Sequence, residues 1–410
     1  MSKRILILSD SIAPPAYAPR VVSLTRYLCQ KGWEVVVFSD CENGVIPFAD
    51  QYGRWEHTAY YQSGHSHWRY IADKVFGQRE HMFQAHIEAT VDVASYDAIL
   101  CSTCYYFPLQ TTYRLARKYS KPFIVDLRDI AEQWGDIPYL THSVLPSRRI
   151  NRWLHKIFTS QNLRQRNRVI QAANYLTTIS PWHQQLLSKI NPCTALIYNG
   201  FDENEFYPEN RHTDQFILSY TGKIYDLHFR DPRLLFEAMQ QLIAKQQIDA
   251  SKVEIRFHID GPSIEPLRQL VARYGLRDVC RIENYIPKEE LLPLLHRSSI
   301  LLVLTCLSTP DGAHGIMGTK FYEALGAEKP VLCIRSDEEC LAQVVQETNA
   351  GLAGTNAQQV TQLVLDKYHE WEQNGFTRQN VVQTEKKRFT RQYESAQFEQ
   401  LILHILTSKS

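Results

Sequence analysis

The sequence predicts an α/β fold made of two doubly wound, Rossmann-like halves, each built on a parallel sheet. Short apolar segments alternate with segments of helical periodicity, which is typical of βαβ units. The apolar segments are continuous rather than alternating, which indicates strands covered on both faces. The pattern restarts near residue 215, so we expect two halves that face a central cleft at the carboxyl ends of their strands.

In the first half, strands are predicted at residues 4–9, 33–39, 96–101, 122–126, 175–179 and 195–198. Helices are predicted at residues 21–31, 109–119 and 181–190. In the first of these helices, Val21, Leu24 and Leu28 recur at helical spacing, and Gly32 is a residue type that commonly ends a helix.

In the second half, strands are predicted at residues 215–220, 253–259, 279–285, 300–305 and 330–334. Helices are predicted at residues 233–245, 266–274, 288–296 and 320–326, and a last helix at about 389–406. Residues 199–213 are rich in turn formers and predict the linker between the halves. We therefore expect an N-terminal domain over residues 1–205, a C-terminal domain over 206–388 and a C-terminal helix over 389–410.

The composition argues against several classes of protein. The 410 residues include 45 Lys and Arg and 44 Asp and Glu, whereas nucleic-acid-binding proteins are usually clearly basic. No stretch of about 18 apolar residues is present, so we expect a cytoplasmic protein. Nine cysteines, an odd number, argue against a disulfide framework. Cys101 and Cys104 form a C-x-x-C pair with no second pair to complete a zinc site, so we expect buried structural thiols.

The segment from His314 to Glu323 follows an apolar strand and opens a helix. Glycines such as Gly318 let a backbone approach a ligand closely, and a helix start with free N–H groups binds phosphate. We expect Thr319 to cap this helix, and Lys320 and Glu323 to share one face of it. The lysine would pair with a phosphate and the carboxylate with ribose hydroxyls. An ordinary capped helix explains the same residues, but the position at a strand end favours a binding site.

A second group of candidate residues follows the first strand of the second half. Gly222 and Lys223 come directly after that strand, and Arg230 and Arg233 lie in the next loop and helix start. Cations at this edge would neutralise a diphosphate leaving group without a metal ion. A solvated loop is the alternative explanation.

In the first half, Asp126, Arg128 and Asp129 end a strand, and Arg128 and Asp129 are the candidates for substrate contact. Asp126 is equally explained by hydrogen bonds to the turn. The loop over residues 14–20 reaches the same edge without a dinucleotide-binding G-x-G-x-x-G pattern, and the chain has neither a P-loop motif nor an H-E-x-x-H motif.

A basic stretch over residues 148–168 carries six arginines and a lysine, with apolar residues between them. This pattern fits either a helix on an anionic membrane surface or a surface helix whose apolar side packs inward. The second interpretation is slightly favoured by the pattern alone.

An ordered set of short motifs resembles the retaining GT-B glycosyltransferases of glycosyltransferase family 4, the group 1 transferases. The motifs are Gly32-Trp33-Glu34-Val35, Tyr96-Asp97, Asp126-Leu127-Arg128-Asp129, Thr178-Ile179-Ser180-Pro181, Tyr198-Asn199-Gly200-Phe201-Asp202, Tyr220-Thr221-Gly222, Asp260-Gly261, Tyr285-Ile286-Pro287 and the segment from Phe321 to Val331. The resemblance covers nearly the whole chain.

The resemblance implies a nucleoside-diphosphate sugar bound mainly by the C-terminal half, an acceptor bound mainly by the N-terminal half, and transfer with retention. Lys223 and Arg230 are similar to the pair that grips the diphosphate, and Glu323 to the ribose carboxylate. Gly222, Gly261, Gly318, Thr319 and Lys320 complete the implied donor site. Arg128 or Asp129 would approach the transferred sugar, and Tyr17 and Arg20 would contact acceptor or sugar. The terminal helix would cross back onto the first domain.

The resemblance also implies a wider role. Bacterial relatives mostly build capsule, O-antigen or exopolysaccharide on lipid-linked acceptors, which would place the chain in the cytoplasm, peripheral to the inner face of the plasma membrane. No cofactor or metal is implied. Gly315 stands where members often carry a second glutamate that touches the donor sugar, and Asp311 or Lys320 would have to substitute for it. Two alternatives therefore stay open: a sugar-nucleotide epimerase of similar fold, and a non-catalytic partner subunit that binds a nucleotide sugar.

Overall fold

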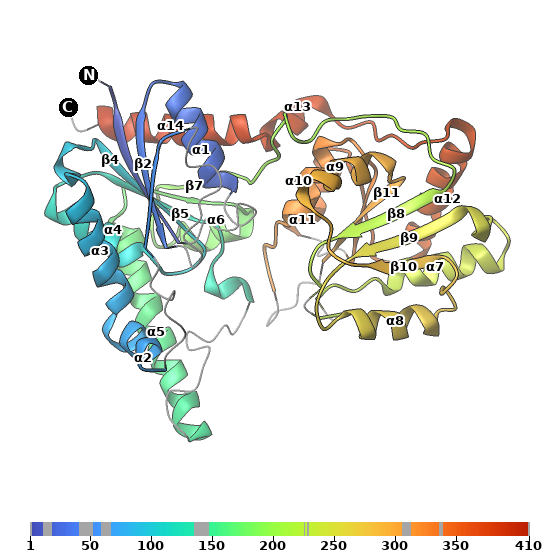
Figure 1. The fold of residues 1–410 in the computed structure, drawn as a ribbon, viewed down its shortest axis with the longest axis horizontal. Helices are drawn as coiled ribbons and strands as arrows, with labels where there is room; N and C mark the ends of the chain where they lie inside the picture. Colours follow the sequence, from blue (N-terminus) through green and yellow to red (C-terminus); the bar gives the residue numbers. More distant parts are fainter. Residues whose placement is uncertain are drawn as a thin grey trace. The chain divides into compact units, whose positions relative to one another are not determined.

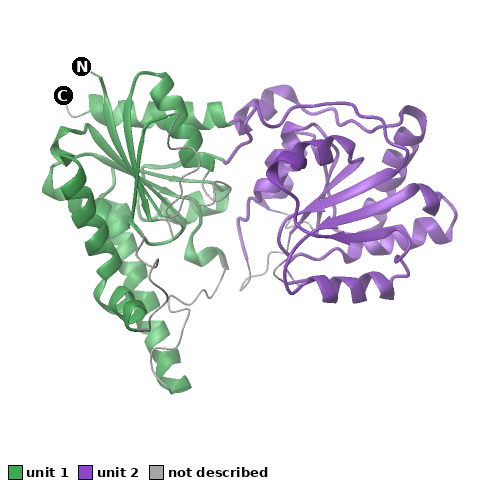
Figure 2. Cartoon of the chain, viewed as in Figure 1, with its two compact units in different colours: residues 1–198, 391–410 green, residues 199–390 purple. Residues whose placement is uncertain are grey.

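The computed structural model describes residues 2–10, 19–40, 52–58, 67–134, 147–224, 226–227, 229–305, 313–335 and 339–408. The chain divides into two compact units (Figure 2). Unit 1 comprises Met1–Tyr198 and Arg391–Ser410, and unit 2 comprises Asn199–Thr390. The boundaries therefore lie at 198/199 and 390/391, where the sequence suggested 205/206 and 388/389. Residues just after 198 belong to unit 2 because Phe201 forms a parallel bridge with Thr390 there.

In the described part of unit 1, seven parallel strands form one sheet in the order β3-β2-β1-β4-β5-β6-β7 (Figure 1). We call this sheet 1. From β1 the chain adds successive strands first on one side, up to β3, and then on the other side, from β4 onward. The topological switch point of sheet 1 therefore lies between β1 and β4. The strands are β1 (Arg4–Ser9), β2 (Glu34–Asp40), β3 (Arg54–Thr58), β4 (Ala98–Thr103), β5 (Phe123–Leu127), β6 (Tyr175–Thr178) and β7 (Thr194–Leu196).

Helices cover both faces of sheet 1. Ile5 and Ile7 of β1 pack with residues of α1 and α14, whereas Leu6 and Leu8 pack with residues of α3, α4 and α5 on the other face. The prediction of strands covered on both faces is therefore confirmed. The helices of unit 1 are α1 (Pro19–Gln30), α2 (His67–Phe76), α3 (Gln78–Thr90), α4 (Leu109–Lys118), α5 (Arg148–Ala172), α6 (Pro181–Leu187) and α14 (Arg391–Thr407).

The described residues of unit 2 form a second parallel sheet of six strands, in the order β10-β9-β8-β11-β12-β13. Its switch point lies between β8 and β11. The strands are β8 (Phe216–Thr221), β9 (Val253–His258), β10 (Cys280–Glu283), β11 (Ile300–Leu304), β12 (Val331–Ile334) and β13 (Gly351–Ala353). The predicted pair of doubly wound parallel sheets is thus confirmed.

One large buried cluster joins the strands of unit 2 to three of its helices, with Phe236 of α7, Leu267 of α8 and Tyr368 of α12 among its members. The helices of unit 2 are α7 (Arg233–Ala244), α8 (Ile264–Arg273), α9 (Lys288–Arg297), α10 (Thr319–Gly326), α11 (Cys340–Glu347), α12 (Ala357–Asn374) and α13 (Gln383–Lys386). Short 3-10 helices in the two units span Val93–Ser95, Ala131–Trp134, Ala250–Lys252 and Lys387–Phe389.

Two further expectations concern the whole chain. Cys101 is buried and Cys104 is partly buried, and burial raises the pKa of both thiols, which agrees with structural cysteines. Within the described ranges, none of the helices combines the length and the apolar character that crossing a bilayer requires.

Candidate active site

The carboxyl ends of β8 and β11 bring together several of the predicted residues in unit 2. Gly222 directly follows β8 and has φ +139°, a conformation that favours glycine. The Tyr220 hydroxyl donates to the carbonyl of Lys223 at 3.2 Å, which fixes the turn after the glycine. A Cβ atom at Gly222 would lie 3.8 Å from Cε of Lys320, so the α10 lysine packs beside this turn.

Lys320 and Glu323 share one face of α10, as the sequence predicts. The Lys320 Nζ atom lies 3.0 Å and 3.3 Å from the two carboxylate oxygens of Glu323. The predicted cap is wrong: Gly318 occupies the N-cap position without a side-chain hydrogen bond, and Thr319 is the first residue of the helix. Because glycine has no side chain to bond the first turn, the N–H groups of that turn stay suited to an anion.

Cationic side chains surround the same switch point. Arg230 donates from Nη1 to the carbonyl of Leu304, the last residue of β11. Lys223 is exposed, and none of the described carboxylates forms an ion pair with it. The buried carboxylate of Asp231 holds two more arginines, Arg233 at 2.7 Å and Arg335 at 3.2 Å. Sheet 2 therefore presents a cluster of positive charge at the strand ends where ligands bind in such folds.

The remaining donor-site predictions lie around this cluster. Gly261 follows β9 with φ +87°, and a Cβ atom there would meet nothing within 4 Å. Gly315 has φ +63°, a left-handed conformation that disfavours a glutamate, which gives a local reason for its departure from the family pattern. The neighbouring His314 pairs with Glu339 at 3.0 Å. Asp311 lies outside the described residues, as does Tyr17.

In unit 1, three side chains meet at the carboxyl ends of β1, β4 and β5. Arg128 forms an ion pair with Asp10 through Nη2. The other carboxylate oxygen of Asp10 accepts from the backbone N–H of Cys104 at 3.0 Å. Burial raises the pKa of the adjacent Asp129 to about 6, although Arg128, Gln133 and Cys104 oppose the shift. A carboxyl with a pKa near neutrality at a strand end is typical of a functional site.

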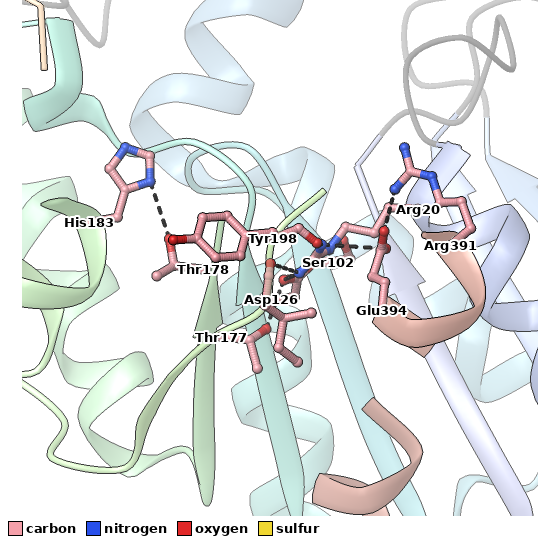
Figure 3. A network of polar contacts seen from close by, with 10 residues as sticks. Arg20, Ser102, Asp126, Thr177, Thr178, His183, Tyr198, Arg391 and Glu394 are labelled. Atoms are coloured by element: carbon pink, nitrogen blue, oxygen red, sulfur yellow. Dashed lines mark hydrogen bonds and ion pairs between the residues drawn. The ribbon is translucent and has the colours of Figure 1, made fainter. Parts of the chain in front are cut away.

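Arg20 lies at the centre of a buried network (Figure 3). It donates to both carboxylate oxygens of Asp126 at 3.0 Å and lies 3.3 Å from Glu394 of α14. It also donates to the carbonyls of Ile197 and Tyr198 at 3.0 Å each. Asp126 in turn accepts from the hydroxyls of Ser102 and Thr177. Every nitrogen of this guanidinium that can donate is engaged inside unit 1, and the predicted contact with acceptor or sugar stays a prediction.

The family assignment rests on the second unit of the chain. Residues 202–388 match the family model described as "Glycosyl transferases group 1". Residues 202–388 therefore form a group 1 glycosyltransferase domain. No curated protein sequence matches the chain.

Solved structures share the fold of this glycosyltransferase over nearly its whole length. HepE of Anabaena, solved with UDP and glucose, has a TM-score of 0.66 and 14% identity, covering 98% of this chain and 100% of its own. Sucrose-phosphate synthase from Thermosynechococcus elongatus has a TM-score of 0.67 and 15% identity, covering 99% and 100%. The lipopolysaccharide outer core galactosyltransferase WaaB, in its apo form, has a TM-score of 0.58 and 13% identity, covering 98% and 99%. Identities this low show the fold alone, and that fold is the predicted GT-B architecture.

Several residues of these sites were missed by the sequence analysis of the glycosyltransferase. Asp10 directly follows β1 and Arg335 directly follows β12. Arg128 was singled out because side chains at the carboxyl end of a parallel strand lie where ligands bind, and the same argument applies to these two residues. Asp231 and Glu394 give no such signal, because their roles depend on partners distant in the sequence. Among the described residues, no three His, Cys, Asp or Glu side chains come together as a metal site, and independence from metals stays a prediction.

Proposed function

We propose that this glycosyltransferase binds a nucleoside-diphosphate sugar in unit 2 and transfers the sugar to an acceptor hydroxyl with retention. The observation that carries the proposal is the meeting of Gly222, Lys223, Arg230 and the Lys320–Glu323 pair at the switch point of sheet 2. A small-residue turn, cations and a helix start at one strand edge suit a diphosphate, and a carboxylate beside them suits a ribose.

Each residue has a distinct proposed role. Lys223 and Arg230 stabilise the charge that develops on the departing diphosphate, so the step needs no metal ion. Backbone N–H groups at Gly318 and Thr319 add to this stabilisation from the start of α10. Glu323 accepts hydrogen bonds from ribose hydroxyls, and Lys320 holds its carboxylate in place.

Unit 1 supplies the proposed acceptor side. Arg128 and Asp129 are the proposed contacts with the transferred sugar, since both follow β5 and Asp129 has a perturbed pKa. We assign Arg20 the part of a positioning residue, because Asp126, Glu394 and two carbonyls occupy its donors. Tyr17 remains a proposed acceptor contact.

The proposed acceptor is a glycan, lipid-linked at a membrane surface. Ile150, Trp153 and Ile157 recur along α5 with exposed side chains, and that of Trp153 is 62% exposed. Arg152 and Lys156 lie between them on the same helix, and Arg148 and Arg149 directly precede Ile150. An exposed apolar row among cations supports attachment to an anionic membrane. This would place the enzyme on the cytoplasmic side of the plasma membrane, in the synthesis of a cell-surface polysaccharide such as capsule or O-antigen.

The first test measures thermal stability with UDP, GDP, ADP, CMP and their common sugar conjugates. UDP-glucose is the first conjugate to try, because HepE was solved with UDP and glucose. A ligand that binds only the native state raises the melting temperature by mass action. A selective shift with one nucleotide supports the donor site, and no shift with any of them contradicts it. Turnover of the donor without an acceptor would indicate an epimerase, and binding without any turnover a non-catalytic partner subunit.

Lys223→Ala tests the assignment of the diphosphate contact. We expect it to lower transfer at least 100-fold, on the order of one lost transition-state donor, with an unchanged melting temperature because the side chain is exposed. Lys252→Ala is the matched control, since Lys252 is also exposed in unit 2 but lies at the opposite, amino end of β9. Equal activity in the two variants would overturn the role of Lys223.

A further inference from the structure

Unit 1 contains a cavity of about 640 Å³ that the donor site does not use. Its volume falls within the range of roughly 300–1,000 Å³ that is usual for small-molecule sites. Residues of the strand ends, of the corner between α2 and α3, and of α4 and α5 line it. All of these residues belong to unit 1, so the cavity is a property of that unit alone.

The cavity begins at the topological switch point of sheet 1. Asp10 follows β1, Thr103 is the last residue of β4, and Cys104 follows it. All three residues line the cavity. The switch point is where ligands enter doubly wound folds. Asp10 also pairs with Arg128, which places the cavity next to the residues proposed to approach the transferred sugar.

Aromatic side chains give the cavity apolar surfaces. The lining includes Tyr105, Tyr106, Phe107, Tyr113 and Phe158. Guanidinium groups lie over two of the rings. The Cζ atom of Arg79 is 3.9 Å from the ring centroid of Phe107, and that of Arg168 is 5.7 Å from the ring centroid of Tyr113.

The lining also includes three residues with amide side chains, Gln110, Gln161 and Gln165. A lining that combines flat apolar surfaces with amides suits a sugar ring, which has apolar C–H faces and hydroxyls around its edge.

Cationic side chains outnumber carboxylates in the cavity lining, which includes Lys74, Arg79, Arg114, Arg166 and Arg168 against Asp10, Asp73 and Glu80. Two of the arginines also pair with carboxylates outside the lining. Arg166 pairs with Glu132 at 2.6 Å and Arg79 with Asp40 at 2.6 Å. Arg168, in contrast, forms no ion pair with any described carboxylate. The Nη2 nitrogen of Arg114 is buried and has no hydrogen-bond partner among the described residues, although Nε donates to Gln84.

A buried guanidinium nitrogen without an acceptor is costly unless a ligand provides one. Both arginines line the cavity. The buried Nη2 nitrogen of Arg114 lacks an acceptor oxygen, and the exposed guanidinium of Arg168 has no ion-pair partner among the described carboxylates. A negatively charged oxygen satisfies a guanidinium best.

We infer that this cavity holds the acceptor, and that the acceptor is a glycan with an anionic group, either a sugar carboxylate or a phosphate, which Arg168 and Arg114 recognise. The identification of the bound glycan as the acceptor rests on the proposed function. The binding of an anionic sugar is nevertheless measurable without any transfer reaction.

The test is ligand-observed NMR on the full chain with four probes: glucose, glucuronic acid, glucose 6-phosphate and inorganic phosphate. Saturating nucleotide, chosen by its thermal shift, keeps the probes out of the donor site. We expect glucuronic acid or glucose 6-phosphate to bind at least tenfold more tightly than glucose or phosphate. The better of the two acidic sugars distinguishes a carboxylate from a phosphate. If inorganic phosphate bound as tightly as the acidic sugars, the cavity would be an anion site without sugar recognition, and the inference would be overturned.

Arg168→Ala connects the binding to the cavity. Arg168 and Arg164 are both exposed residues of α5, but only Arg168 lines the cavity, which makes Arg164→Ala the matched control. We expect Arg168→Ala to weaken binding of the acidic sugar at least tenfold and Arg164→Ala to leave it unchanged. Equal binding in both variants overturns the inference while nucleotide binding stays intact. A failure of every nucleotide to bind would instead count against the donor site and leave the cavity result standing.

Discussion

At the scale of single residues, Asp129 couples the candidate site to pH. Burial raises its pKa from 3.8 to about 6, so the folded protein holds this proton more tightly than the unfolded chain does. Its stabilising effect is therefore present at low pH and is lost as pH rises from about 4 to 6. A rise in pKa from 3.8 to about 6 corresponds to roughly 3 kcal/mol.

Asp129→Asn removes this titration and keeps the shape of the side chain. We expect the variant to be more stable than the parent at pH 7.5, by up to about 3 kcal/mol, with the difference shrinking towards pH 4. Urea unfolding at pH 4.5, 6.0 and 7.5 measures it. If the pKa of Asp129 were not raised, the free energy of unfolding of parent and variant would change with pH in parallel. That outcome would contradict the raised pKa.

Single residues also mark the limit of what the sequence predicts. Lys320 and Glu323 were placed on one face by spacing alone, because the helical repeat fixes that relation locally. The capping role of Thr319 was wrong, because the neighbouring Gly318 already has the extended conformation of a cap. The carboxylate of Asp231 that gathers Arg233 and Arg335 depends on tertiary packing, which one sequence does not reveal.

At the scale of elements, Arg20 of α1 links this helix to β5 and α14 through its contacts with Asp126 and Glu394. The carboxylates of Asp126 and Glu394 that flank it are about 1% exposed. Replacing Arg20 would leave two buried negative charges without their partner, which costs about 3–5 kcal/mol in comparable cases.

Arg20→Met tests this, because it removes the guanidinium charge and keeps an unbranched apolar side chain. We expect a loss of unfolding free energy of about 3–5 kcal/mol, measured by urea denaturation at pH 7.5. Arg4→Met is the control, because Arg4 pairs with Glu34 on the surface at 2.6 Å, and such pairs contribute less than about 1 kcal/mol. Similar losses in the two variants would show that the buried network does not hold these elements together.

Elements with a strong apolar pattern were predicted well, and those without one were missed. The strand predicted at 300–305 is β11 (Ile300–Leu304), whose residues are all buried. Strand β3 (Arg54–Thr58) has the sequence RWEHT, without an apolar run, because it lies at the edge of sheet 1 and its side chains are only partly covered. An edge strand is paired on one side only, so its residues carry a weaker signal.

At the scale of the whole molecule, the restart of the βαβ pattern was enough to predict two units. Each unit has its own sheet and its own buried clusters, which is why the pattern repeats in the sequence. The separation at 198/199 was harder to predict, since Phe201 and Phe206 join unit 2 by packing against the helix end at Gly326. Turn-forming residues indicated a connection there but not the side to which it packs.

Two units with separate cores predict a separable response to ligands. A nucleoside diphosphate bound in unit 2 should stabilise that unit by about 2.7 kcal/mol at a hundred times its dissociation constant. Hydrogen exchange followed by mass spectrometry resolves the two units, because peptides from residues 199–390 report on unit 2 and peptides from 1–198 on unit 1. We expect nucleotide to slow exchange in β8, β11 and α10, and Lys223→Ala to abolish that protection. An acidic sugar should instead slow exchange in α4 and α5, and Arg168→Ala should abolish it. Protection of unit 1 alone by the nucleotide would place the donor in the wrong half and refute the assignment of both sites.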